Sequence, residues 1–124
     1  MNFLVSPSAK SNWRISMEEL AAAARQDWPL VNLEVVQNSQ SIYALSWHLE
    51  IDGRRLDGAL TKDGTTLHLN GDLRDCAKFA LWFRTKVPDQ QSLLFYDEGF
   101  SADVSLSRGT TETDLVQPFQ MGAD

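Results

Sequence analysis

The sequence has little of what marks several large classes of protein. It contains one cysteine, four prolines and seven glycines among 124 residues, which excludes a disulfide scaffold and a collagen-like or proline-rich chain. No apolar run approaches the ~20 residues that a membrane-spanning helix needs. The N-terminal residues also lack the basic flank and long apolar stretch of a signal peptide. We therefore expect a soluble, cytoplasmic protein without membrane contact, folded as a single domain over residues 1–124.

The motifs of common catalytic sites are also missing. The sequence has no phosphate-binding loop, GxGxxG, HExxH, GxSxG or EF-hand pattern. Cys76 belongs to no CxxC pair and falls on the apolar side of a predicted helix, where cysteine acts as a small hydrophobic residue. These absences favour a protein that is not an enzyme, without excluding an enzyme of unfamiliar type.

Negative charge is concentrated at one end of the chain. Residues 1–88 hold ten basic and ten acidic side chains, so the net charge of −6 arises entirely in residues 89–124. That segment contains seven acidic residues and a single basic one, Arg108. A local negative field repels nucleic-acid phosphates and attracts basic proteins. We therefore expect no nucleic-acid binding and a basic protein as partner, unless the acidic residues serve only solubility.

Helical periodicity and capping signals predict two main helices and a short third one. Ser16 and Glu19 form a capping box for the first helix, and Asp72 can cap the second. Pro118 is expected to end the third helix, and residues 120–124 are expected to form a disordered tail. The predicted helices run from about Met17 to Trp28, from about Leu73 to Thr85 and from Thr110 to Val116.

Alternating apolar residues and turn signals predict the strands. In residues 43–51 every odd position is apolar, from Tyr43 to Ile51. Asp52-Gly53 and Asp63-Gly64 each predict a two-residue hairpin loop, and both loops place the leucines on one face. Further strands are expected near residues 2–5, 31–35, 93–96 and 102–106.

The expected element order is (β)αββββαββ(α). It predicts an α+β fold, with a mostly antiparallel sheet of about 5–7 strands and the two main helices packed on one face.

The predicted hairpin register gathers both histidines near one carboxylate. His48 lies opposite Asp57, and His68 lies opposite Ala59, one diagonal step from Asp57. Two imidazoles and a carboxylate can bind zinc or act in acid–base catalysis. An alternative function is therefore a metal-binding protein or metal-dependent hydrolase that uses His48, Asp57 and His68. The simpler alternative is a polar sheet face with ordinary cross-strand pairs.

Two further features indicate a surface for a protein partner. Asp97, Glu98 and Asp103 lie in or near the turn at Tyr96–Phe100 and can attract basic side chains. Phe79 and Trp82 extend beyond the apolar stripe of the second helix, and exposed aromatic rings mark partner surfaces. We predict a non-catalytic interaction module that uses Asp97, Glu98, Asp103, Phe79 and Trp82. The alternatives are a turn that needs these acidic residues for its geometry and a helix stripe wide enough to bury both rings.

In size and charge the chain is similar to small acidic α+β proteins that neutralise a toxin, such as bacterial immunity proteins. No motif carries this likeness, so it is an analogy. The sequence is compatible with a monomer or with a homodimer formed through a sheet edge or the face that bears Ile42 and Ala44. A small-ligand pocket between helices and sheet is a further alternative.

Overall fold

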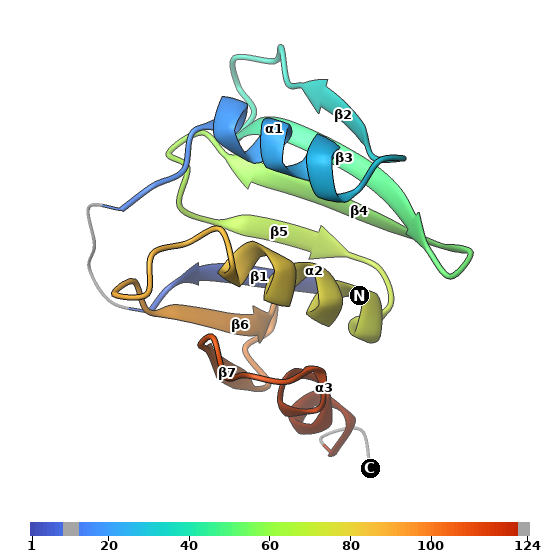
Figure 1. Cartoon of the computed structure of the whole chain (residues 1–124), viewed down its shortest axis with the longest axis vertical. Coiled ribbons are helices and arrows are strands. Elements are labelled where there is room, and N and C mark those ends of the chain that lie inside the picture. The colour runs from blue at the N-terminus through green and yellow to red at the C-terminus, as the bar shows by residue number, and fades with distance from the viewer. Residues whose placement is uncertain (9–12, 122–124) are drawn as a thin grey trace.

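The computed structural model describes residues 1–8 and 13–121, and within them seven strands form one sheet in the order β2-β3-β4-β5-β1-β6-β7 (Figure 1). Every neighbouring pair of strands is antiparallel. The strands are β1 (Asn2–Pro7), β2 (Asn32–Val35), β3 (Tyr43–Ile51), β4 (Arg54–Thr61), β5 (Leu67–Asn70), β6 (Leu93–Asp97) and β7 (Asp103–Leu106). The helices are α1 (Met17–Asp27), α2 (Leu73–Arg84) and α3 (Glu112–Met121). The predicted α+β fold and its element order are confirmed.

The N-terminal strand holds the two parts of the sheet together. β1 pairs with β5 on one side and with β6 on the other. It therefore joins the β2–β5 meander to the β6–β7 hairpin. Phe3 and Val5 of β1 are fully buried, so this strand lies at the centre of the core.

One face of the sheet is covered by helices. Figure 1 shows α1 and α2 on the same side of the sheet, while α3 packs against α2 and β7. The core lies between the sheet and these helices, with Trp47 and Phe79 stacked at 5.5 Å between ring centroids. The other side of the sheet, called the open face below, carries residues that alternate with the core positions. None of the helices described is long and apolar enough to cross a membrane.

Both predicted hairpins have the expected registers. Leu49 pairs with Leu56 in the first hairpin, and Gly58 pairs with Leu69 in the second. The prediction for Tyr43 was wrong, because the register shifts between Tyr43 and Leu45. The extra residue moves Tyr43 from the core face to the open face, as expected of a β-bulge.

The helix starts follow the predicted capping signals. The Ser16 hydroxyl accepts a hydrogen bond from the backbone N–H of Glu19 at 3.1 Å. The Asp72 carboxylate accepts one from the backbone N–H of Arg74 at 2.9 Å. These bonds pair backbone donors that the first turn of a helix leaves without partners.

The end of α3 differs from the prediction. The helix continues through Pro118 to Met121, so residues 120 and 121 are not part of a tail, and residues 122–124 lie outside the described residues. Proline removes one backbone hydrogen bond from a helix interior. Packing offsets this loss, because the Phe119 ring makes edge contacts with Phe3 and Phe95 at 5.2 and 5.6 Å between centroids.

Candidate functional site

The turn between β6 and β7 is built around Asp97. Its carboxylate accepts hydrogen bonds from the backbone N–H of Ser101, at 2.7 Å, and from the Ser101 hydroxyl. Its carbonyl oxygen accepts a bond of 3.0 Å from the N–H of Phe100. Burial acts to raise the pKa of Asp97, but the bonds from Ser101 prevail and hold that pKa below its ordinary value of 3.8. Asp97 is therefore ionised at neutral pH and shapes the turn.

This turn exposes the aromatic ring of Phe100. Its φ of 55° lies in the left-handed region, which costs a bulky residue about 1–2 kcal/mol. The ring stacks on that of Tyr96, with 4.5 Å between centroids, and 62% of Phe100 is exposed. The Tyr96 hydroxyl is hydrogen-bonded to the Ser6 hydroxyl at 2.9 Å, which ties the ring pair to β1. Strained backbone and exposed aromatic side chains are both typical of binding sites.

Two acidic side chains accompany the ring pair. Tyr96 and its cross-strand partner Asp103 lie on the open face, whereas Asp97, the next residue along β6, lies opposite the buried Phe3. Glu98 accepts a hydrogen bond of 3.0 Å from the side-chain amide of Asn2. Within the described ranges, neither Glu98 nor Asp103 forms an ion pair with lysine or arginine. We name Tyr96, Glu98, Phe100 and Asp103 the turn surface.

The aromatic residues predicted on α2 do not belong to this surface. Phe79 is fully buried, so the expectation that it meets a partner was wrong. It packs among Trp28, Trp47 and Trp82. The apolar side of α2 is wider than the predicted stripe because Trp28 and Trp47, from two other segments, also pack on Phe79.

Trp82 is partly buried and held by polar contacts. Its indole N–H donates a hydrogen bond of 2.7 Å to Asp27. Asp27 also forms an ion pair of 2.9 Å with Lys86. The contact with Lys86 lowers the pKa of Asp27 the most, and the hydrogen bond from Trp82 lowers it further. Trp82 therefore links α2 to the end of α1, away from the β6–β7 turn.

The two histidines share the open face but make other contacts than predicted. His48 pairs with Asp57, and His68 with Ala59, in the expected register. The carboxylate of Asp57, however, accepts hydrogen bonds from Arg55 at 3.0 and 3.2 Å. In the part of the chain that is described, no group of three or more His, Cys, Asp or Glu residues is placed to hold a metal ion. The zinc or hydrolase alternative thus gains no support from the geometry.

His68 instead takes part in a chain of hydrogen bonds. Its Nδ1 lies 2.7 Å from the Tyr43 hydroxyl and its Nε2 lies 3.2 Å from Oδ1 of Asn2. The Asn2 amide oxygen can only accept, so Nε2 carries a proton and donates. The side-chain NH₂ group of Asn2 donates a hydrogen bond to the carboxylate of Glu98. The chain therefore connects the bulge in β3 to the turn surface across the open face.

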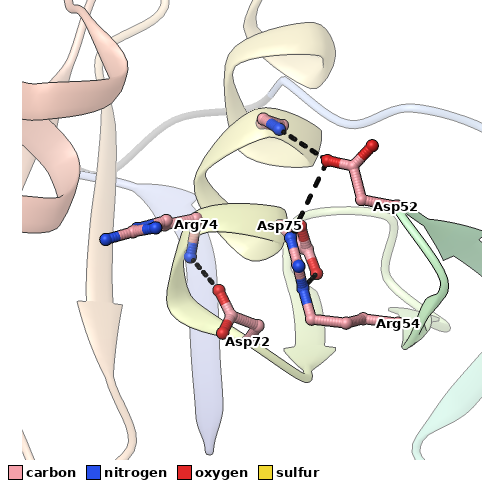
Figure 2. A network of polar contacts seen from close by, with 6 residues as sticks. Asp52, Arg54, Asp72, Arg74 and Asp75 are labelled. Carbon is pink, nitrogen blue, oxygen red and sulfur yellow. Dashed lines mark hydrogen bonds and ion pairs between the residues drawn. The ribbon is translucent and has the colours of Figure 1, made fainter.

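An ion pair between the buried Asp75 and the half-exposed Arg54 fastens the β3–β4 hairpin to α2. Asp75 is fully buried and accepts two hydrogen bonds of 2.9 Å from the guanidinium of Arg54. Asp52 at the hairpin turn adds ion pairs with Arg54 and Lys78, at 3.8 and 3.5 Å. Figure 2 shows Arg74 directed away from this group. Because the contacts of Asp75 are satisfied within the chain, we assign it a structural role.

The other buried reactive or charged side chains are also structural. Burial raises the pKa of the Cys76 thiol to about 12, so it is protonated at neutral pH and a poor nucleophile. Arg84 is buried and donates hydrogen bonds of 3.1–3.3 Å to backbone carbonyls of residues 87–89. It holds the loop after α2.

No protein-family model matches the chain, and neither a curated protein nor a solved structure matches it. Function is therefore inferred from the residues and their geometry.

Proposed function

We propose that the protein is a non-catalytic interaction module that binds a basic partner protein through the turn surface. The observation that carries this proposal is the exposed ring of Phe100, held in a left-handed conformation beside Glu98 and Asp103. Aromatic residues dominate the energy of many interfaces, and acidic residues around them steer basic partners toward the correct orientation. The turn surface combines both features.

The charge distribution supports a basic partner. The segment that contains the turn surface accounts for the whole net charge of −6. Its only basic residue, Arg108, forms an ion pair with Asp89, so it does not offset Glu98 or Asp103 locally. A negatively charged surface accelerates encounter with a positively charged protein.

The rigidity of the surface also supports binding. Phe100 rests on Tyr96, Tyr96 is bonded to Ser6 of β1, and Glu98 is bonded to Asn2 of the same strand. Side chains already ordered before binding lose less conformational entropy on association. An interaction site anchored on an interior strand of the sheet is therefore favoured over a mobile loop.

The test compares wild type with two variants, using a partner captured from cells that produce the protein. Phe100→Ala removes the exposed ring, and Glu98→Gln with Asp103→Asn removes two charges. The matched control is Glu50→Gln with Asp52→Asn, which changes the charge equally on the β3–β4 hairpin. We expect Phe100→Ala to weaken binding at least tenfold, or about 1.4 kcal/mol. Equal binding by all four proteins would refute the assignment of this surface.

A further inference from the structure

The sheet has two edges, and they differ in what lies beside them. β2 and β7 are the edge strands. α3 packs beside β7. Two exposed large hydrophobic residues belong to the β2 edge: Val35 lies in β2 and is 46% exposed, and Leu30 lies two residues before the strand begins and is 92% exposed. Lysine and proline on an edge strand hinder pairing with another chain, and β2 has neither, so another strand can pair with it.

The backbone of β2 has hydrogen-bonding groups that point outward. The Val36 N–H donates a hydrogen bond to the carbonyl of Ala44. This bond shows which residues of β2 point their backbone groups toward β3, since these alternate with residues that point theirs away. Glu34 and Asn32 therefore also point their backbone groups toward β3, and Leu33 and Val35 point theirs away. In the described ranges, Leu33 and Val35 form no backbone hydrogen bond outside the sheet. Two N–H groups and two carbonyls are thus available for a further strand.

A groove with apolar and charged residues in its lining runs beside this edge, the charged ones being Glu18, Arg25 and Glu34. It has a volume of about 190 Å³ and lies between α1 and β2. Its apolar lining includes Met17, Ala21, Leu33 and Val35. A strand added to β2 would place its own apolar side chains over this groove.

We propose that β2 pairs antiparallel with β2 of a second copy of this chain, so that the dimer contains one continuous sheet. Residues paired across antiparallel strands share a face, which restricts the possible registers. Centring the two-fold axis on Leu33 places Leu33 opposite Leu33 and Val31 opposite Val35 of the second copy. It also places Asn32 opposite Glu34, where an amide can donate to a carboxylate. Centring the axis on Glu34 would place two carboxylates together, so the Leu33 register is favoured.

The distribution of charge permits this dimer. The turn surface lies at the opposite edge of the sheet, six strand spacings away. At about 4.8 Å for each spacing this is about 29 Å, well beyond the Debye length of about 8 Å in physiological salt. The acidic ends of the two copies therefore contribute little repulsion at the β2 seam. The proposal does not depend on the proposed partner of the turn surface.

Sedimentation velocity of the full chain tests the dimer. We expect wild type to sediment as a dimer and Val35→Lys to dimerise at least tenfold more weakly, because the lysine lies at the seam. Ser105→Lys, which places the same charge on β7, is the matched control and should remain dimeric. Wild type that stays monomeric at every concentration tested, or Val35→Lys that is folded and dimerises as wild type does, would overturn the proposal.

Disulfide trapping tests the register independently of Val35→Lys. Asn32→Cys and Glu34→Cys proteins are mixed, allowed to exchange subunits and oxidised, with Cys76 buried in both. In the Leu33 register the two new cysteines face each other in a non-hydrogen-bonded pair, with Cα atoms about 4.5 Å apart, which suits a disulfide. We expect covalent dimers from the mixture and not from either protein alone. Covalent dimers from Glu34→Cys alone would contradict the Leu33 register.

Discussion

The ring of Phe100 stacks on that of Tyr96, with 4.5 Å between centroids and 17° between planes, although 62% of Phe100 remains exposed. The backbone φ of Phe100 is positive, a conformation that glycine adopts without cost. A hydrophobic ring at this position stacks on Tyr96 at a cost in backbone stability. This cost agrees with the proposed role of Phe100 in binding.

Phe100→Gly separates these two roles. Relief of the left-handed strain, about 1–2 kcal/mol, offsets the lost ring stacking of about 0.5–1.5 kcal/mol. We expect the free energy of unfolding in urea to change by less than about 1 kcal/mol while partner binding weakens at least tenfold. A large loss of stability with unchanged affinity would mean that Phe100 serves the fold.

Asp97→Asn tests the turn through pH. A carboxyl group whose pKa is lowered by folding stabilises the protein above its unfolded pKa, and this contribution disappears as pH falls through the folded pKa. For Asp97 the loss begins below about 3.8. We expect the thermal midpoint of wild type to fall more steeply than that of Asp97→Asn as pH drops from about 5 to about 2. Asp27 and Asp63 also have lowered pKa values, so the difference between the two proteins is the relevant quantity. Parallel curves would show that Asp97 does not stabilise the turn.

Asp75→Asn tests the ion pair between α2 and the β3–β4 hairpin. Breaking a buried pair typically costs about 3–5 kcal/mol, and the half-exposed Arg54 side chain reduces the expected loss here to about 2–3 kcal/mol. Lys78→Ala, which removes only a surface ion pair with Asp52, is the control and should cost less than about 1 kcal/mol. Urea unfolding measures both. Equal effects would contradict the structural role of Asp75.

Gly58→Ala tests the packing of Trp47 on β4. A Cβ at residue 58 would lie 2.4 Å from atoms of the Trp47 ring, so the indole would have to move. Overpacking of this kind costs about 1–3 kcal/mol. Gly109→Ala has no atom within 4 Å of the new Cβ and is the matched control. A Gly58→Ala protein as stable as the control would show that the core is looser at Trp47 than described.

Local signals predicted most of the fold because they agreed with one another. The two Asp-Gly turns and the alternating residues of β3–β5 implied a single register, and the structure has it. The bulge that moves Tyr43 and the helical continuation through Pro118 were missed, because both depend on distant partners such as His68 and Phe3. The same holds for Asp75, whose partner Arg54 is 21 residues away in the sequence.

The candidate site was predicted only in part. Charge alone located Glu98 and Asp103, since clusters of acidic residues are visible in a sequence. Phe100 was not among the predicted residues, because its exposure and positive φ follow from the turn geometry. A bulky aromatic residue directly after Asp97-Glu98-Gly99 was the available signal, since turns favour small or polar residues there. Phe79 was misplaced because the tryptophans that bury it come from other segments of the chain.

The most direct test of the central claim is the association rate of the captured basic partner, measured at about 10 mM and about 150 mM salt. The Debye length falls from about 30 Å to about 8 Å between these conditions. We predict slower association of Glu98→Gln/Asp103→Asn than of Glu50→Gln/Asp52→Asn in low salt, with the difference shrinking in high salt. Identical rates and identical salt dependence for the two double variants would contradict binding through the turn surface.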